Sequence, residues 1–187
     1  MESYVALLRG INVSGQKSMK MQDLRSLLAK NGFLNVQTYV QSGNVIFTMD
    51  EESSPFLPEE RIEKLIQEKY GFRVRVFVKT SEEIQYILRN NPFLNPADAR
   101  NNEVNPGSLY VSFLSKKPED EHFAITENKY LPDSFIIDEK IIYLHCPGGY
   151  GKTKLNNTFF EKKLKLDATT RNWKTLTKLA EISASGR

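Results

Sequence analysis

Cysteine, histidine and long apolar runs are all scarce in this 187-residue chain, and each scarcity excludes a class of protein. Cys146 is the only cysteine, so the chain forms no internal disulfide and no cysteine-based metal cluster, and we expect a buried, unreactive thiol. The longest apolar runs, Tyr4–Leu8, Val45–Phe47 and Ile141–Leu144, are too short to cross a membrane. Glu2 stands where a signal peptide carries basic residues. We therefore expect a cytoplasmic protein with no membrane partner.

An excess of one charge sign is also lacking. The 26 basic and 23 acidic residues leave a net charge of +3, which does not by itself indicate a nucleic-acid partner. Of the two histidines, His122 lies in a charged segment and His145 ends an apolar run beside Cys146. Adjacent strand residues point to opposite faces, so His145 and Cys146 cannot form a catalytic dyad. We assign no catalytic residue, and we expect no metal and no cofactor.

What is present is a regular alternation of strand and helix patterns over the first ~80 residues. Helices are predicted over 19–31 and 58–70, and a third opens at the Thr80–Glu83 capping pattern and ends before Asn91 and Pro92. Strands are predicted over 4–8, 36–40, 45–48 and 74–78. The order β-α-β-β-α-β predicts a ferredoxin-like unit with strand order 4-1-3-2, each strand antiparallel to its neighbours.

The second half repeats part of this order. A strand over 109–114, a short helix over 118–124 and a hairpin over 135–144 are followed by two predicted helices. Those helices span 158–166, with Thr158 and Glu161 as a capping box, and 170–183. The predicted fold class is therefore α+β, a ferredoxin-like half plus a related β-α-β-β half with C-terminal helices. We expect a sub-domain over 1–90, a linker over 91–107 and a second sub-domain over 108–187.

Two polar, glycine-containing loops of the first half are candidates for a binding site. In the predicted topology the first two strands run the same way and the third returns beside the first. The loop that begins at Arg9 and the turn Gln41–Asn44 therefore meet at one edge of the sheet. Glycines there allow the backbone to approach a ligand, and an arginine at a strand end is suited to a bidentate contact with an anion.

The last predicted helix adds a third segment. Thr170 is a natural N-cap, yet Arg171 and Lys174 then occupy a first turn that disfavours cations, which an anion would relieve. An exposed pair of charges is the alternative. The predicted ligand-binding residues are Arg9, Gly10, Asn12, Gln41, Ser42, Asn44, Arg171 and Asn172.

The segment 146–153 imitates a nucleotide-binding P-loop. It ends in Gly151-Lys152-Thr153, but Cys146 occupies the place of the first glycine and Pro147 removes an N–H group. We therefore expect a basic connector and no phosphate cradle.

Four motifs are similar to one family. YVALLRGINVSG, QSGNVIF, NPF at 91–93 and TRNWKTLTKL resemble DUF1697, a family of bacterial proteins of unknown function, over nearly the whole chain. The resemblance implies an α+β structure of ferredoxin-like halves and carries no established activity. Family members often read GINVGG where this chain has Ser14 before Gly15.

These observations lead to one functional expectation with two alternatives. We expect the chain to bind a phosphate-bearing ligand, a nucleotide, phosphate or nucleic acid, at the converging loops. The alternatives are an enzyme that acts on such a ligand and a structural or oligomerisation protein without a ligand. The oligomeric state is open.

Overall fold

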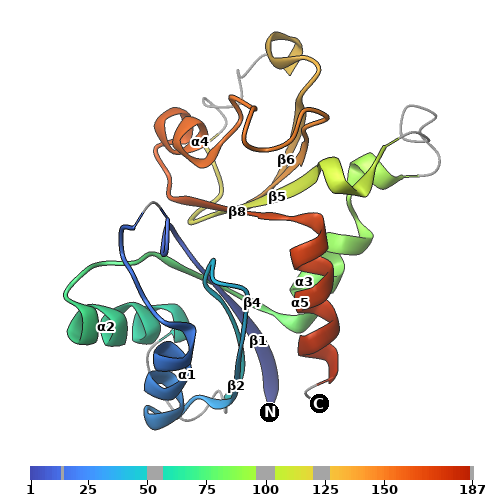
Figure 1. The fold of residues 1–187 in the computed structure, drawn as a ribbon. Coiled ribbons are helices and arrows are strands. Elements are labelled where there is room, and N and C mark those ends of the chain that lie inside the picture. Colours follow the sequence, from blue (N-terminus) through green and yellow to red (C-terminus); the bar gives the residue numbers. More distant parts are fainter. Residues whose placement is uncertain (14, 50–56, 96–103, 120–126, 186–187) are drawn as a thin grey trace. The chain divides into compact units, whose positions relative to one another are not determined.

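The computed structural model describes residues 1–13, 15–49, 57–95, 104–119 and 127–185 and divides into two compact units (Figure 1). The first unit consists of Met1–Tyr86 and Lys178–Arg187, and the second is Ile87–Thr177. The division falls inside two helices, α3 (Ser81–Arg89) and α5 (Trp173–Ser185). Within the described residues, no helix is both long and apolar enough to cross a membrane.

The first unit is built on a four-stranded sheet in the order β2-β3-β1-β4. Its strands are β1 (Glu2–Leu8), β2 (Leu34–Tyr39), β3 (Asn44–Met49) and β4 (Val76–Thr80). Every neighbouring pair is antiparallel. The predicted strand order is therefore confirmed, and the central strand β1 ends between the start of β3 and the start of β4.

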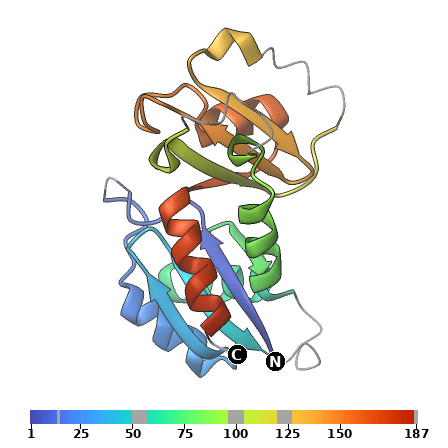
Figure 2. The ribbon, with the colours of Figure 1, turned by 90° about the vertical axis from the view of Figure 1, so that its right-hand side faces the viewer.

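Both faces of this sheet are covered. Helices α1 (Met21–Lys30) and α2 (Pro58–Tyr70) lie on one face (Figure 1), where Ala6 and Phe47 join one core with Leu24 and Ile62. The parts of α3 and α5 that belong to this unit lie on the other face (Figure 2). Because both faces are covered, every residue of β1 from Ser3 to Leu8 is buried, as its nearly continuous apolar run predicts.

Local sequence signals set the helix ends of the first unit. Pro58 occupies the first turn of α2, and Gly71 ends that helix with a left-handed φ of +77°. The predicted capping box of α3 is present: the Glu83 N–H donates to Thr80 Oγ1 at 3.1 Å, and the Thr80 N–H donates to Glu83 Oε2 at 2.8 Å.

The second unit contains a sheet of the same topology. Its strands, in the order β6-β7-β5-β8, are β6 (Ser134–Asp138), β7 (Ile141–His145), β5 (Leu109–Leu114) and β8 (Ala168–Asn172). All neighbours are again antiparallel. The two sheets thus share one chain order of strands although the sequence shows no clear repeat. The molecule is a mixed α+β protein with two four-stranded sheets and five α-helices within the described residues.

Strand β8 corrects the predicted second half. The sequence predicts a helix from Thr170, but Ala168–Asn172 pairs with β5 and α5 begins only at Trp173. The run Ala168-Thr169-Thr170 is rich in β-branched residues, which favour a strand when a partner edge is present. The last helix therefore begins three residues later than predicted, at Trp173.

One helix packs on the core of the second unit. Helix α4 (Asn157–Leu164) places Phe160 and Leu164 in a cluster with Leu144 and Cys146. Its N-cap is Asn156, whose Oδ1 accepts from the Phe159 N–H at 3.0 Å, so the predicted Thr158 capping box is wrong.

Three short 3₁₀ helices also belong to the described residues of the second unit. They are η2 (Pro92–Leu94), η4 (Pro106–Ser108) and η6 (Glu127–Tyr130), and asparagines cap the first two. Of the predicted helix over 118–124, Pro118 and Glu119 are not helical and the remainder lies outside the described residues.

Candidate functional site

The two predicted loops of the first unit do meet at one end of the sheet. The Leu8 N–H donates to the carbonyl of Gly43 at 2.8 Å, which joins the end of β1 to the β2–β3 turn. The side chain of Asn12 reaches the same turn and donates to the Gln41 carbonyl at 2.9 Å. The convergence that strand order predicts is thus present as direct hydrogen bonds.

Amide side chains hold the two loops in place. Asn12 Nδ2 also donates to the Met19 carbonyl at 2.9 Å, and its Oδ1 accepts from the Met19 N–H at 2.8 Å. Asn44 Nδ2 donates to the carbonyl of Tyr39 and to Ser42 Oγ. The side-chain amides of Asn12 and Asn44 therefore stabilise the two loops, and both N–H groups of the Asn12 amide are used in these hydrogen bonds.

Two glycines serve different purposes here. Gly43 has φ +79°, and a Cβ at this position would lie 2.7 Å from Ile11 Cδ1, so the turn packs directly on the first loop. Gly10 has φ +64°, but no heavy atom lies within 4 Å of an added Cβ. Gly43 is thus required by packing, whereas the backbone at Gly10 is open to a ligand.

A third segment, residues 71–75, contacts the first loop, and it is not among the residues predicted from the sequence. The Arg9 N–H donates to the Arg75 carbonyl at 2.9 Å, and Lys17 Nζ donates to the Arg73 carbonyl at 2.7 Å. We use the name loop cluster for residues 9–13 and 15–20, the turn 40–43 and the segment 71–75. The signal that could have located the third segment is the antiparallel pairing of β4 with β1, which brings residues before β4 to the end of β1.

The loop cluster concentrates positive charge. Continuing the register Leu8 opposite Val76 puts Arg9 opposite Arg75, a like-charged cross-strand pair that is unfavourable by itself. Glu63 compensates in part, because its Oε1 lies 3.4 Å from Arg75 Nη1. Lys17 adds a further cation with an exposed side chain. The arrangement is therefore suited to an anion with more than one negative group.

Arg171 and Asn172 belong to the second unit and differ from the prediction in detail. Arg171 lies in β8, is 8% exposed, and its Nη1 donates to Thr169 Oγ1 and to the Thr170 carbonyl, each at 2.9 Å. Asn172 is the residue that caps α5, since its Oδ1 accepts from the Thr175 N–H at 2.7 Å. Arg171 is therefore not in the first turn of α5, and the argument from an unfavourable charge there does not apply to it.

The glycine-rich segment after β7 forms turns. The Gly149 N–H donates to the Cys146 carbonyl at 2.9 Å and the Lys152 N–H to the Gly149 carbonyl at 3.1 Å. Because α4 begins only at Asn157, Lys152 is not at a helix start, as it would be in a P-loop. Cys146 is buried, and burial raises the pKa of its thiol to about 11, which agrees with the expected unreactive thiol.

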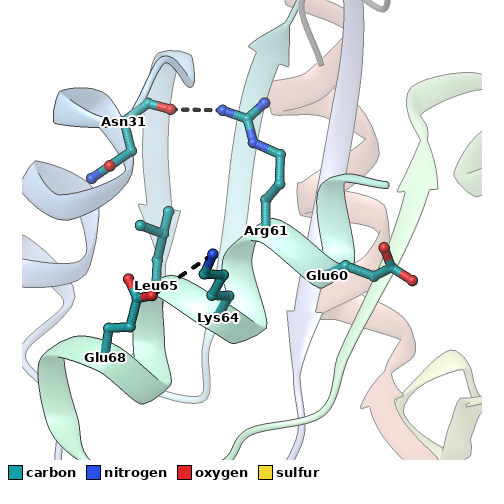
Figure 3. Close-up of a pocket in the computed structure, with 6 residues that line it drawn as sticks. All are labelled: Asn31, Glu60, Arg61, Lys64, Leu65 and Glu68. Carbon is teal, nitrogen blue, oxygen red and sulfur yellow. Dashed lines mark hydrogen bonds and ion pairs between the residues drawn. The ribbon is translucent and has the colours of Figure 1, made fainter. Parts of the chain in front are cut away.

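A pocket of about 530 Å³ lies on the first unit between α2 and the end of α1, and none of the predicted site residues is among its lining residues (Figure 3). Three of its four charged lining side chains, Arg61, Lys64 and Glu68, contact other protein groups. Arg61 Nη2 donates to the Asn31 carbonyl at 2.8 Å and its guanidinium lies 4.7 Å from the centre of the Phe33 ring, while Lys64 pairs with Glu68 at 3.9 Å. The Arg61 hydrogen bond therefore holds α2 against the end of α1.

Comparisons with known proteins identify a family but no activity. The family model DUF1697, described as "Protein of unknown function (DUF1697)", matches residues 1–143. Among solved structures, the chain is similar to the conserved bacterial protein SP0830 from Streptococcus pneumoniae, with a TM-score of 0.67 and 23% identity over 96% of this chain and 97% of that chain. At this identity the likeness concerns the fold. No curated protein matches the chain.

Proposed function

Because this chain belongs to DUF1697, a family of unknown function, we propose a function from its own residues: it binds a phosphate-bearing ligand at the loop cluster. The observation that carries the proposal is that Arg9, Lys17 and Arg75 come from separate segments and gather at one sheet end. A like-charged group of this kind is stabilised when an anion binds to it.

The ligand contacts follow from the geometry of the loop cluster. Arg9 stands at the end of a buried strand, so its side chain starts from a rigid position and loses little entropy on binding. Gly10 leaves its backbone open to a phosphate oxygen. Arg73 and Lys17 form an exposed basic rim. Gln41 and Ser42 are exposed and form the wall that the turn contributes, whereas Asn44 is fully buried and holds the turn through Tyr39 and Ser42, so it would not contact the ligand.

The principal test is Arg9→Ala, measured by calorimetric titration with pyrophosphate, ATP and a short single-stranded DNA. Loss of one charge-assisted contact predicts a fall in affinity of about tenfold or more. Lys30→Ala is the control, because Lys30 is an exposed cation at the far end of α1 and should leave the affinity unchanged. The melting temperature of Arg9→Ala should stay close to that of the parent chain.

Four outcomes separate the alternatives. Saturable binding of ATP favours a small-ligand site, whereas salt-sensitive binding of DNA favours a nucleic-acid partner. Turnover of a bound nucleotide would identify an enzyme. A strongly lowered melting temperature for Arg9→Ala, together with no binding of any anion, would instead assign Arg9 a structural role and reject the proposal.

The same proposal includes two finer expectations about the molecule. We interpret the first unit as ferredoxin-like, and its β-α-β-β-α-β order and its strand order support this interpretation. We also keep the expectation of a cytoplasmic location, which the single cysteine supports.

A further inference from the structure

The second unit contains a pocket whose lining residues carry no formal charge. The pocket has a volume of about 560 Å³, within the usual range for small-ligand sites. It is formed by η4 and the residues before it, by the end of β7 and by the turn that follows, with Asn105, Ser108, His145 and Gly149 among its lining residues. Among the described residues of this lining, none is Lys, Arg, Asp or Glu.

Hydrogen bonds of side chains and backbone hold the walls of the pocket in place. The Gly107 N–H donates to Asn105 Oδ1 at 2.8 Å, and Ser108 Oγ donates to the Asn105 carbonyl at 2.7 Å. The Cys146 N–H donates to the Ser108 carbonyl at 2.8 Å, which ties η4 to the end of β7. The pocket is therefore a formed feature of the second unit, with two chain segments linked at its floor.

Two planar polar groups of the lining remain available. Within the described part of the chain, no hydrogen bond is made by the His145 imidazole or by the Asn105 NH₂ group. Asn105 Oδ1 accepts one bond and can accept another, so the amide still presents a donor beside an acceptor. Burial lowers the pKa of His145, while nearby Asp133 acts in the opposite direction. A neutral imidazole likewise offers one donor and one acceptor.

An aromatic ring and a buried amide lie in η2 and its cap, outside the lining of the pocket. The ring of Phe93 in η2 lies 5.7 Å from that of His145, at an interplanar angle of 45°. Asn91, which caps η2 through its Oδ1, is 3% exposed, and its Nδ2 has no hydrogen-bond partner in the described structure. Phe93 thus packs beside the pocket residue His145, whereas Asn91 is not a residue of the lining.

We propose that this pocket binds an uncharged planar heterocycle with a donor–acceptor edge, of the nucleobase type. A charged ligand would lose its hydration here without gaining an opposite charge. An asparagine amide matches the edge of such a ring in the way that it pairs with adenine in nucleic-acid recognition, and the imidazole of His145, which lines the pocket, is a ring on which a planar ligand can stack. The pocket belongs to the second unit, so this inference stands or falls independently of the phosphate site.

The test uses the full chain, titrated with adenosine and cytidine as uncharged probes, by calorimetry and by amide NMR shifts. We expect saturable binding with shifts at Asn105, Gly107 and His145. Asn105→Asp keeps the acceptor for the Gly107 N–H but removes the NH₂ donor, and should weaken binding about tenfold or more. His145→Phe keeps a ring and removes the polar edge, and should weaken binding similarly. Lys30→Ala should leave binding unchanged.

A second titration distinguishes the source of the base. Binding of adenosine itself indicates a free nucleoside, whereas binding of a short single-stranded oligonucleotide alone, with the same sensitivity to Asn105→Asp, indicates a base presented by a strand. If His145→Phe does not fold, the affinity of Asn105→Asp for the same probes tests the proposal by itself. The proposal is overturned if adenosine, cytidine and the oligonucleotide all fail to shift the signals of the pocket residues at millimolar concentration, or if both substitutions leave the affinity unchanged.

Discussion

At Gly43, two separate constraints exclude a side chain. Its φ is +79°, and an added Cβ would lie 2.7 Å from Ile11 Cδ1 and 2.8 Å from Leu8 Cβ. We expect Gly43→Ala to lower the free energy of unfolding by about 2–5 kcal/mol, because left-handed strain contributes about 1–2 and overpacking about 1–3 kcal/mol. Denaturation in urea measures this difference.

Gly71 provides the matched control for that substitution. Its φ of +77° is nearly the same, but no heavy atom lies within 4 Å of an added Cβ. Gly71→Ala should therefore lose only the backbone contribution, about 1–2 kcal/mol. Equal losses for the two variants would show that close packing of the turn on the first loop does not constrain Gly43.

Cys146 gives a prediction for pH. Burial raises the pKa of its thiol from 9.0 to about 11, with a smaller lowering from Thr153. At pH 8 the folded chain should react with a thiol reagent far more slowly than the chain in denaturant. Because the pKa of this thiol is higher in the folded chain than in the unfolded chain, its contribution to the free energy of unfolding is fully present below pH 9. That contribution is lost as the pH rises through about 11. Equal reaction rates in the two states would contradict the burial of this thiol.

At the scale of elements, a group of hydroxyls joins β5, β8 and α4 in the second unit. Thr170 Oγ1 donates to Asn157 Oδ1 at 2.6 Å and accepts from Tyr150 Oη at 3.0 Å. It also lies 2.6 Å from Ser112 Oγ, and since a hydroxyl has one proton, Ser112 must be the donor in that contact.

Thr170→Val should therefore destabilise the second unit. The valine keeps the shape but leaves three polar partners without their hydrogen bonds, which predicts a loss of about 1–3 kcal/mol for the unsatisfied groups. Thr170→Ser keeps the hydroxyl and should lose clearly less. Thermal unfolding of both variants provides the measurement, and similar melting temperatures for valine and serine would show that these hydrogen bonds contribute little.

At the scale of the whole molecule, the first unit includes the end of the chain. Lys178–Arg187 belongs to it, and Ser183 Oγ lies 2.9 Å from Ser81 Oγ, with both serines buried. Leu179, fully buried, is part of the same segment. The first ~90 residues alone therefore lack the buried apolar side chain of Leu179, which the complete unit includes.

A comparison of two shortened chains tests this organisation. Residues 1–86 joined through a flexible Gly/Ser linker to 178–187 should have a clearly higher melting temperature than residues 1–86 alone. Restoring one buried leucine is worth about 2–5 kcal/mol. Substituting Leu179 by Ala in the joined chain should remove most of the gain. Identical melting curves for the two shortened chains would show that the C-terminal segment does not stabilise the first unit.

Local patterns in the sequence were sufficient for most elements of the first unit. The capping box at Thr80 and Glu83, the Gly71 stop and the apolar run of β1 are signals that neighbouring residues carry by themselves. Strand order then followed from the order of elements, because right-handed connections leave few arrangements. The meeting of the Arg9 loop with the Gln41 turn could be predicted for the same reason.

Only the tertiary structure decided the rest. Strand β8 depends on the free edge of β5, so the helix-like pattern after Asn172 could not reveal where the strand ends. The third segment of the loop cluster and the uncharged pocket beside His145 bring together residues far apart in the chain. Short-range propensity determines which segments become helices or strands, but the side chains that face a common ligand are set by pairing and packing between distant segments, which local sequence does not encode.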